Sequence, residues 1–171
     1  MSTPTGLPAY GAPETPIDPK IAQPGDTFVI NDTRYRVEGV VTCVEDGYRW
    51  TEFAIRATAG EEPELQYVGY DDGKWTLWTD LEDADLAPDG TIRYNGTVYV
   101  LDDDGRATYT SVGDTDVAEH GVVDYRDYKV RGDKSQRLSL ERWDAPEGTS
   151  WEASLGEHIA GGAITAYRPL S

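Results

Sequence analysis

Residues 35–55, YRVEGVVTCVEDGYRWTEFAI, constrain the fold more than any other stretch, because they have the pattern of two long β-strands joined by a tight turn. In the first strand apolar and polar side chains alternate with a period of two, as expected for a strand with one buried face. The predicted apolar face carries Tyr35, Val37, Val41 and Cys43, and the other face carries Arg36, Glu38 and Thr42. Residues 45–47, Glu-Asp-Gly, favour a type I turn followed by a left-handed glycine.

Gly39 interrupts the first of these strands. A glycine inside a strand usually marks a bulge or a bend, so we expect an irregularity at this position. In the returning strand the predicted faces are Thr51, Phe53 and Ile55 on one side and Tyr48, Trp50, Glu52 and Ala54 on the other. Because both faces carry apolar side chains, we expect both sides of the hairpin to be covered.

Further strand-like segments fill the rest of the chain, each bounded by Gly, Pro, Asp or Ser. They are residues 27–30, 65–70, 74–79, 92–94, 97–101, 106–112, 122–130, 137–143, 151–155 and 164–167. Turns are predicted at residues 71–73, 95–96 and 102–105. Since no segment longer than about ten residues has a helical period, we expect short helical turns at most. The predicted class is all-β, a single compact domain of two antiparallel halves that are barrel-like or sandwich-like.

The organisation of the chain follows from its prolines and from a weak internal similarity. Six of ten prolines fall in the first 24 residues, which predicts a disordered Pro-rich tail over 1–24 and a β domain over 25–171. Residues 31–37 and 95–101 share the pattern N-x-T-x-Y-x-apolar at a spacing of 64 residues. This pattern indicates either an internal duplication with halves 25–90 and 91–171, or ordinary turn chemistry before two strands.

The formal net charge of −17 is the clearest indication of the kind of partner. Residues 61–104 hold 13 acidic residues against Lys74 and Arg93. Nucleic acid and anionic lipid need a basic surface, so neither is an expected partner. Cations and basic protein surfaces would be attracted. The alternative is that the acidity serves solubility and turn formation alone.

The sequence carries neither an export signal at its start nor a run long enough to span a bilayer, so we expect a cytoplasmic protein without membrane insertion. Its single cysteine, Cys43, lies on a predicted apolar face and is expected to be a small buried hydrophobe.

Sequence signatures of catalysis are absent: there is no G-x-S-x-G elbow, phosphate-binding loop, C-x-x-C or H-E-x-x-H. We therefore predict no catalytic residue, cofactor or metal. Two acid–histidine pairs, at residues 119–120 and 157–158, could in principle meet Asp124 in a metal site. Adjacent strand residues point to opposite faces, however, which argues against such a site.

Several segments occur in this order along the chain: GDTFVI, YRVEGVV, EDGYRWTEF, KWTLW, YNGTVYVLDDDGRATY, VDYRDYK, LSLERW and WEASLGEHI. Together they resemble the bacterial family known as domain of unknown function 4178. The resemblance covers residues 25–168. It implies a small cytoplasmic β-rich domain that works beside membrane-stress proteins and polyamine-related proteins. It supplies no catalytic residues.

Two Trp–Glu pairs are the candidate ligand-binding residues: Trp50 with Glu52, and Glu141 with Trp143. In each pair the carboxylate shares a strand face with an indole. Each Glu either pairs with a neighbouring Arg or backbone amide, or the two faces converge on a cleft that holds a cationic ligand such as a polyamine.

The sequence therefore predicts a non-catalytic binding or adaptor domain, with a protein or a small cation as partner. The alternative is an enzyme that uses carboxylates as acid and base. A Glu with a raised pKa in a cleft, facing another titratable group, would favour the enzyme.

Overall fold

The computed structural model describes residues 13–81, 86, 88–144 and 151–170, and in these ranges the chain forms strands and two single-turn 3-10 helices, with no α-helix. The strands of the first half are β1 (Glu14–Ile17), β2 (Thr27–Ile30), β3 (Thr33–Glu45), β4 (Tyr48–Ala57), β5 (Leu65–Asp71) and β6 (Lys74–Asp80). Those of the second half are β7 (Thr91–Tyr94), β8 (Thr97–Gly113), β9 (His120–Val130), β10 (Asp133–Trp143), β11 (Glu152–Ile159) and β12 (Ile164–Pro169). The 3-10 turns are η1 (Pro19–Ile21) and η2 (Gly161–Ala163). The all-β prediction is confirmed.

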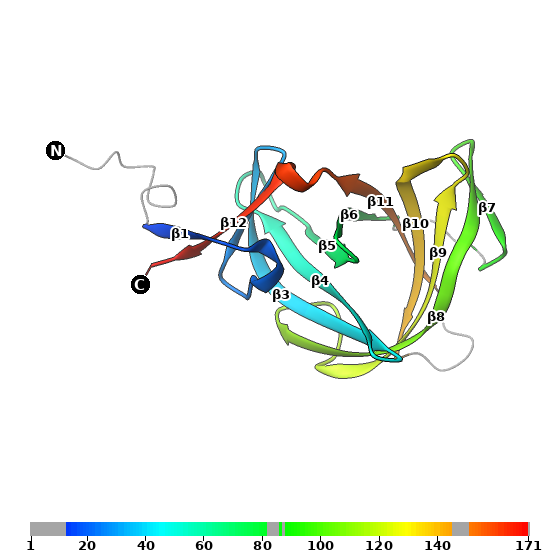
Figure 1. Cartoon of the computed structure of the whole chain (residues 1–171), viewed down its shortest axis with the longest axis horizontal. Helices are drawn as coiled ribbons and strands as arrows, with labels where there is room; N and C mark the ends of the chain where they lie inside the picture. Colours follow the sequence, from blue (N-terminus) through cyan, green and yellow to red (C-terminus); the bar gives the residue numbers. More distant parts are fainter. Residues whose placement is uncertain (1–12, 82–85, 87, 145–150, 171) are drawn as a thin grey trace.

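Eight strands close into a barrel in the order β3, β4, β5, β6, β11, β10, β9, β8 (Figure 1). Closure comes from two antiparallel pairings between the halves of the chain, β3 with β8 and β6 with β11. Each half supplies four strands, so the two predicted halves form one shared barrel. Closure leaves the eight barrel strands without an open edge within the barrel, and the sheet ends at β1 and β7.

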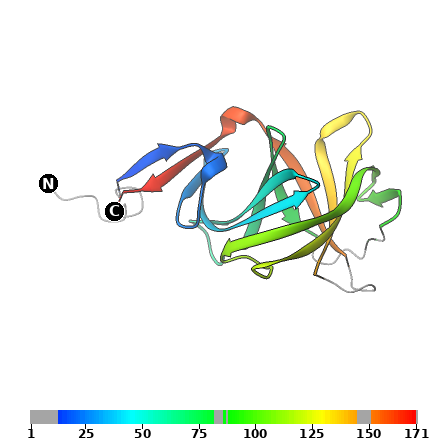
Figure 2. The same ribbon diagram turned by 60° about the horizontal axis from the view of Figure 1, so that its bottom comes forward.

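Two strands pair with different parts of the same edge of β3. Residues 33–36 pair with β2, and residues 39–44 pair with β8. β2 therefore leads away from the barrel to β12 and β1, which form an arm at its side (Figure 2). On the opposite side, β7 extends the sheet from β8 in the same way.

Gly39 lies at a bulge, because the pairing of β3 with β4 shifts between Val37 and Gly39. This confirms the predicted irregularity. The extra residue reverses which alternate side chains point into the barrel. Tyr35 and Val37 pack outside the barrel, whereas Val41 and Cys43 pack among residues that line its interior. The prediction that these four side chains share one face is wrong for this reason.

The second half has the same local geometry. A hairpin turn at residues 95–96 leads from β7 into β8, as the turn at residues 31–32 leads from β2 into β3. The pairing of β8 with β9 then shifts between Leu101 and Asp103, at the 64-residue spacing of the sequence pattern. Tyr99 and Leu101 pack outside the barrel, and Ala107 packs inside. The two halves thus share the geometry that a duplication requires.

Two-residue turns close the main hairpins. At Asp46-Gly47 and at Asp72-Gly73 both residues have positive φ, 50° with 83° and 50° with 79°. Positive φ at both positions defines a type I′ turn, which matches the twist of the flanking strands. The predicted type I turn over residues 45–47 is therefore wrong, since Glu45 still belongs to β3.

The acidic run at residues 102–105 is not a turn, contrary to prediction, because β8 continues through it. Its glycine has a packing reason: a Cβ at Gly105 would lie 2.6 Å from a Glu45 carboxylate oxygen and 2.9 Å from the Tyr125 hydroxyl. The Tyr125 hydroxyl donates a hydrogen bond to Glu45 at this point. Gly105 thus makes room for a polar contact between β3 and β9.

Three apolar clusters stabilise the fold. The first lies between the arm and the barrel and is built on Phe28, Phe53 and Trp75. The second lies beneath β7 and is built on Tyr128 and Leu138. The third lies inside the barrel and contains Val41, Cys43, Ala107, Tyr109 and Val123.

The ordered fold begins earlier than residue 25. Residues 14–17 form β1, and Ala22 is buried in the first apolar cluster. Asp26, only 2 % exposed, binds the Arg168 guanidinium at 2.9 Å and accepts the Gln23 N–H at 2.8 Å. The predicted Pro-rich tail over 1–24 therefore differs from the structure over residues 13–24, where pairing with β12 orders the segment. Residues 1–12 lie outside the described ranges.

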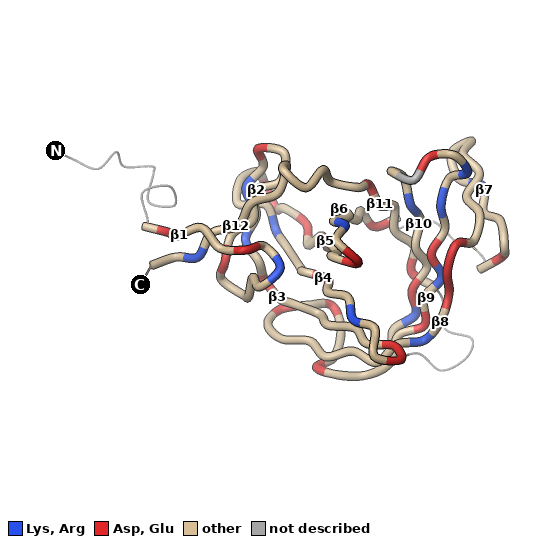
Figure 3. The backbone as a smooth tube through the Cα atoms, in the orientation of Figure 1, with Lys and Arg blue, Asp and Glu red and all other residues tan. Residues whose placement is uncertain are grey.

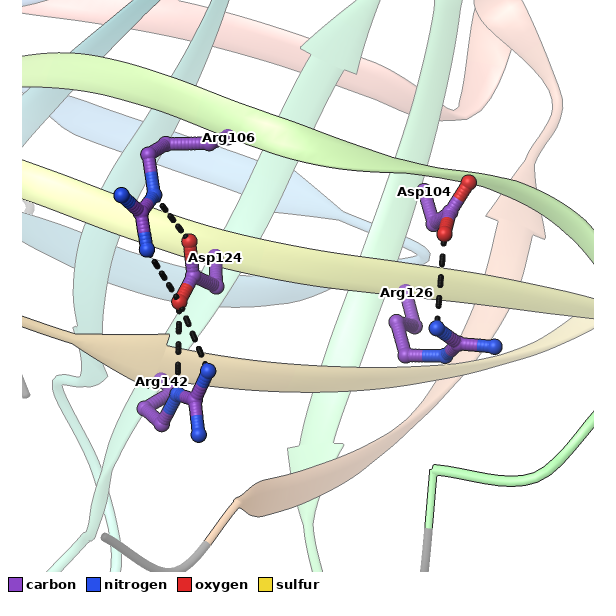
Figure 4. Close-up of polar contacts among 5 residues, drawn as sticks. All are labelled: Asp104, Arg106, Asp124, Arg126 and Arg142. Carbon is purple, nitrogen blue, oxygen red and sulfur yellow. Dashed lines mark hydrogen bonds and ion pairs between the residues drawn. The ribbon is translucent and has the colours of Figure 1, made fainter. Parts of the chain in front are cut away.

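Ion pairs connect β8, β9 and β10 on the outer wall, where basic and acidic positions are interspersed (Figure 3). Asp124 accepts hydrogen bonds from Arg106 at 2.6 Å and from Arg142 at 2.9 Å, and Arg126 binds Asp104 at 3.3 Å (Figure 4). Opposite charges on neighbouring strands stabilise a sheet. These arginines are therefore paired with acidic residues on the outer wall, and their charges do not neutralise the acidic side chains inside the barrel.

Candidate ligand-binding lumen

A cavity of about 360 Å³ lies inside the barrel, and we call it the lumen. Its lining comes from β4, β5, β6, β8, β9, β10 and β11 and from the loop between β8 and β9. This volume is in the range of about 300–1,000 Å³ that is typical of small-molecule sites.

All four predicted site residues line the lumen. Trp50 and Glu52 come from β4, and Glu141 and Trp143 come from β10. In the barrel order three strands separate β4 from β10 on either side, so the two strands form opposite walls. The two Trp–Glu pairs therefore approach one shared space from opposite directions.

The two predicted indoles are each held against a tyrosine. The ring of Trp50 packs edge-on against Tyr125 with centroids 5.4 Å apart. The ring of Trp143 packs in the same way against Tyr109 at 4.9 Å. Edge-to-face contacts of this kind fix ring orientation. Both indoles thus form firm parts of the lumen wall.

Glu52 and Glu141 are enclosed among other acids. Burial raises the pKa of Glu52 to about 7, with a further contribution from the charge of Asp127 and an opposing one from the Trp50 indole. Burial also raises the pKa of Glu141 well above its ordinary value, and the charges of Glu52 and Asp127 raise it further. Each carboxyl therefore keeps its proton to a higher pH than an ordinary glutamate does.

Asp127 is a third interior carboxylate, and it lies on β9 between the two walls. Burial raises its pKa to about 6, although a hydrogen bond from the Ser139 hydroxyl at 2.9 Å and the charge of Arg137 act in the opposite direction. Arg137 itself binds Asp102 at 3.0 Å. Its charge is therefore shared with a carboxylate outside the lumen lining.

The lumen is strongly acidic. Among the described residues that line it there are nine carboxylates, Glu52, Asp71, Asp72, Asp80, Asp103, Asp116, Asp127, Glu141 and Glu152, against Lys74, Arg137 and one histidine, His158. Glu52, Asp127 and Glu141 are half-buried, whereas the other six carboxylates are exposed. Repulsion between like charges is strongest where water is excluded. Protons or a bound cation would therefore relieve the repulsion among the three half-buried carboxylates.

One end of the lumen is covered by the loop between β8 and β9. The Asp116 N–H donates a hydrogen bond to the Tyr67 hydroxyl at 3.1 Å, and Val117 packs on the apolar cluster inside the barrel. Burial raises the pKa of Tyr67, so its hydroxyl stays protonated. Both loop residues belong to the lining.

Sequence reasoning missed Trp78, Asp127 and Glu152, which also line the lumen. Asp127 shares a strand face with Tyr125, so the rule that selected Glu52 and Glu141 would have found it if extended from indoles to tyrosine rings. Trp78 is flanked by glycines on both neighbouring strands, Gly69 and Gly156, and a glycine inside a strand is itself a signal of close packing.

A comparison with known protein families shows the family of this chain. The domain of unknown function DUF4178 matches residues 23–161 of this chain. The chain belongs to the DUF4178 family. This confirms the resemblance in the sequence, and the matched residues include every strand of the barrel.

Three curated relatives of this DUF4178 protein are themselves named as uncharacterised proteins, one from Mycobacterium bovis and two from strains of Mycobacterium tuberculosis. Each is 32 % identical over 154 residues, which cover 87 % of this chain and 73 % of the relative. No solved structure matches the chain. These matches show the family and leave its activity to be inferred from the lumen.

The acid–histidine pairs considered as metal ligands do not meet in the DUF4178 barrel. His158 lines the lumen, whereas Asp124 is held by two arginines on the outer wall. Within the described ranges no three His, Cys, Asp or Glu residues are grouped as a metal site. Cys43 is buried beside the lumen, and burial followed by the charges of Glu52 and Glu141 raises the pKa of its thiol. The thiol is thus held protonated.

The described residues contain no helix that is long and apolar enough to cross a bilayer.

Proposed function

We propose that this DUF4178 protein is a non-catalytic binding domain whose lumen holds an organic cation, such as a polyamine. The observation that carries the proposal is the arrangement of Glu52 and Glu141 on opposite walls of one cavity, each beside an indole. A protonated amine placed between them would supply the positive charge that the enclosed carboxylates require.

Charge and aromatic rings act together in this arrangement. Charge-assisted hydrogen bonds from N–H groups to a carboxylate are about twice as strong as neutral ones. The rings of Trp50, Trp78 and Trp143 add faces that attract a cation, each worth about 0.5–2 kcal/mol. These contributions to the binding free energy are sufficient for micromolar to millimolar affinity after the entropy lost on association is subtracted.

The adaptor role implied by the family resemblance is part of this proposal. A domain in the cytoplasm that takes up a polyamine would report the polyamine level to the membrane-stress and polyamine-related proteins beside which it works.

The test is calorimetric titration of spermidine into the wild type and into the Glu52→Gln, Glu141→Gln double variant. We expect the double variant to lose at least 10-fold in affinity, because two charged acceptors are removed without a change in volume. Raising the salt concentration should weaken binding to the wild type. Octane-1,8-diol, a linear molecule without charge, should give no heat.

Glu157→Gln is the matched control, since Glu157 lies exposed on β11 and does not line the lumen. It changes the net charge of the protein by the same amount as one lumen substitution. Equal heats in the wild type and the double variant would overturn the proposal. A loss of affinity in the control equal to that in the single Glu52→Gln variant would also overturn it, because attraction would then depend on net charge alone.

An enzyme that uses Glu52 and Glu141 as acid and base is the second candidate. The observation that favours it is the pKa of Glu52, about 7, in a cavity that also holds Glu141. Catalytic acids and bases are most efficient when their pKa values lie near the working pH, so a pKa of about 7 suits such a role. If the protein converts spermidine, new proton resonances will grow over hours in an NMR sample of the complex and will be absent with Glu52→Gln. An unchanged ligand spectrum supports the binding role.

A further inference from the structure

Trp78 lies on the lumen wall in a position that two glycines make possible. On β11, a Cβ at Gly156 would come within 2.6 Å of Cζ3 and 2.8 Å of Cε3 of the Trp78 indole. Gly156 is the register partner of Trp78. The six-membered part of the indole therefore occupies the space that any other residue at position 156 would fill.

The other end of the same indole reaches β5. A Cβ at Gly69 would lie 3.3 Å from Trp78 Nε1 and 3.9 Å from Cγ of Glu52. Gly69 is also the register partner of Glu52 on β4. The Trp78 ring and the Glu52 side chain therefore adjoin the same glycine, and a ligand group seated there can contact both.

Neither glycine is required by its backbone conformation. The glycines with positive φ are others, for example Gly47 and Gly73 in turns, and Gly69 and Gly156 are not among them. Both are buried inside strands. Glycine in a strand interior costs stability, so its presence on both sides of one indole indicates a need for space.

We infer that the cationic head of the ligand rests on Trp78, and that Gly69 and Gly156 leave the room that the Trp78 indole needs. This inference rests on the proposed function and names a binding residue within that site. The ligand class that fits is a protonated amine with N–H groups, because the indole face attracts the charge while the Glu52 carboxylate accepts the hydrogen bonds.

The experiment measures spermidine affinity by calorimetry for Trp78→Phe and Trp78→Leu. Trp78→Leu should weaken binding by roughly 2- to 30-fold, and Trp78→Phe should fall between Leu and the wild type, because the attraction follows the ring. Trp151→Leu is the matched control: Trp151 lies outside the lumen, with the Arg142 guanidinium 4.5 Å from its ring centre. It should leave affinity unchanged.

A second measurement keeps the test independent of folding. Ligand protons held over an indole face are shifted upfield by the ring current, so the bound spermidine methylene resonances should move upfield with wild type and lose that shift with Trp78→Leu. Gly69→Ala, whose new methyl group would be only 3.3 Å from Nε1, should reduce affinity while Trp78 is retained. Gly162→Ala has no atom within 4 Å and is the control for a glycine substitution.

The outcomes separate the two proposals. If the wild type binds spermidine and Trp78→Leu binds it equally well with the same upfield shift, the role of Trp78 is refuted and the proposed function stands. If the wild type gives no heat with spermidine, the proposed function itself fails. Graded loss through Phe and Leu, with unchanged thermal unfolding, supports both.

Discussion

Glu141 on β10 lies directly opposite Glu152 on β11, so two like charges face each other in register on one wall of the lumen. Like charges at directly opposed positions of a sheet destabilise it. The outer wall of the same sheet avoids this cost by pairing Arg106 and Arg142 with Asp124. The lumen wall thus opposes two acids where the exterior pairs opposite charges, and the proposed cation would offset that repulsion.

Stability without ligand should fall as the pH rises. The pKa of Glu52 is about 7 in the folded protein, against an ordinary value of 4.5, and the pKa values of Glu141, Asp127 and Glu152 are raised as well. Between pH 4.5 and 7 the folded state therefore binds more protons than the unfolded state, so the free energy of unfolding decreases across that window. Thermal unfolding should occur at a lower temperature at pH 8 than at pH 5.5.

Glu52→Gln isolates this effect. At pH 8 it should stabilise the protein by on the order of 1–3 kcal/mol, because an enclosed charge is replaced by a neutral isostere. At pH 5, where Glu52 is already protonated, it should change little. Glu157→Gln, on the exposed face of β11, should behave as the wild type at both pH values. A pH dependence unaltered by Glu52→Gln would contradict the raised pKa.

The alternation of side chains predicts most of the strands and the all-β class, and the glycine within the first long strand predicts the irregularity at Gly39; β1 and the middle of β8 are not predicted. The alternation also selected Trp50, Glu52, Glu141 and Trp143, because a carboxylate that shares a strand face with an indole is visible in the sequence. What placed these residues in one lumen is the pairing of β3 with β8 and of β6 with β11. Pairings between distant strands leave no local pattern, so a single sequence does not reveal them.

Two errors have specific physical causes. The bulge at Gly39 adds one residue, so Val37 and Val41 face different clusters although a period of two places them together. The sequence predicts the start of the fold too late, because a Pro-rich segment is typical of a disordered tail. Pro16 is tolerated there because β1 is an edge strand.

Ligand binding should strengthen as the pH rises from 6 to 8. Spermidine amines stay protonated over this range, as a lysine amine does. The lumen carboxylates, however, lose their protons as the pH passes the value of about 7 at Glu52 and about 6 at Asp127. Binding at pH 6 must displace protons and should be weaker by roughly 10-fold or more. Calorimetry in two buffers with different ionisation enthalpies measures the protons released, and identical heats in both at pH 6.5 would contradict this linkage.

Asp26→Asn should destabilise the protein. Asp26 is buried and joins the start of the fold to its last strand through Arg168, with Nη2 at 2.9 Å and Nε at 3.0 Å. Asparagine has one acceptor oxygen where aspartate has two, so if its oxygen keeps the bonds from Gln23 N–H and Arg168 Nη2, its NH2 group faces the Arg168 Nε–H and two donors oppose each other. The midpoint of thermal unfolding should fall by roughly 5 °C or more. Asp32→Asn, in an exposed turn at φ 69°, should be neutral since asparagine tolerates that conformation.

Gly39→Ala should destabilise the closure of the barrel by about 1–3 kcal/mol. A Cβ at this position would lie 2.5 Å from Cγ2 of Thr115, 2.7 Å from the Asp114 carbonyl oxygen and 2.8 Å from that of Val112. These atoms belong to the end of β8 and the loop that covers the lumen, so the new methyl group pushes β8 away from β3.

Urea unfolding gives the measurement, with Gly162→Ala as the control because its Cβ would meet no atom within 4 Å. Adding Thr115→Ser removes the side-chain clash and leaves the two carbonyl oxygens, so the double variant should recover only part of the lost stability. A full recovery would place the strain in the Thr115 side chain alone. A Gly39→Ala variant as stable as the wild type would mean that β3 and β8 approach less closely than the register at Gly39 and Gly113 implies.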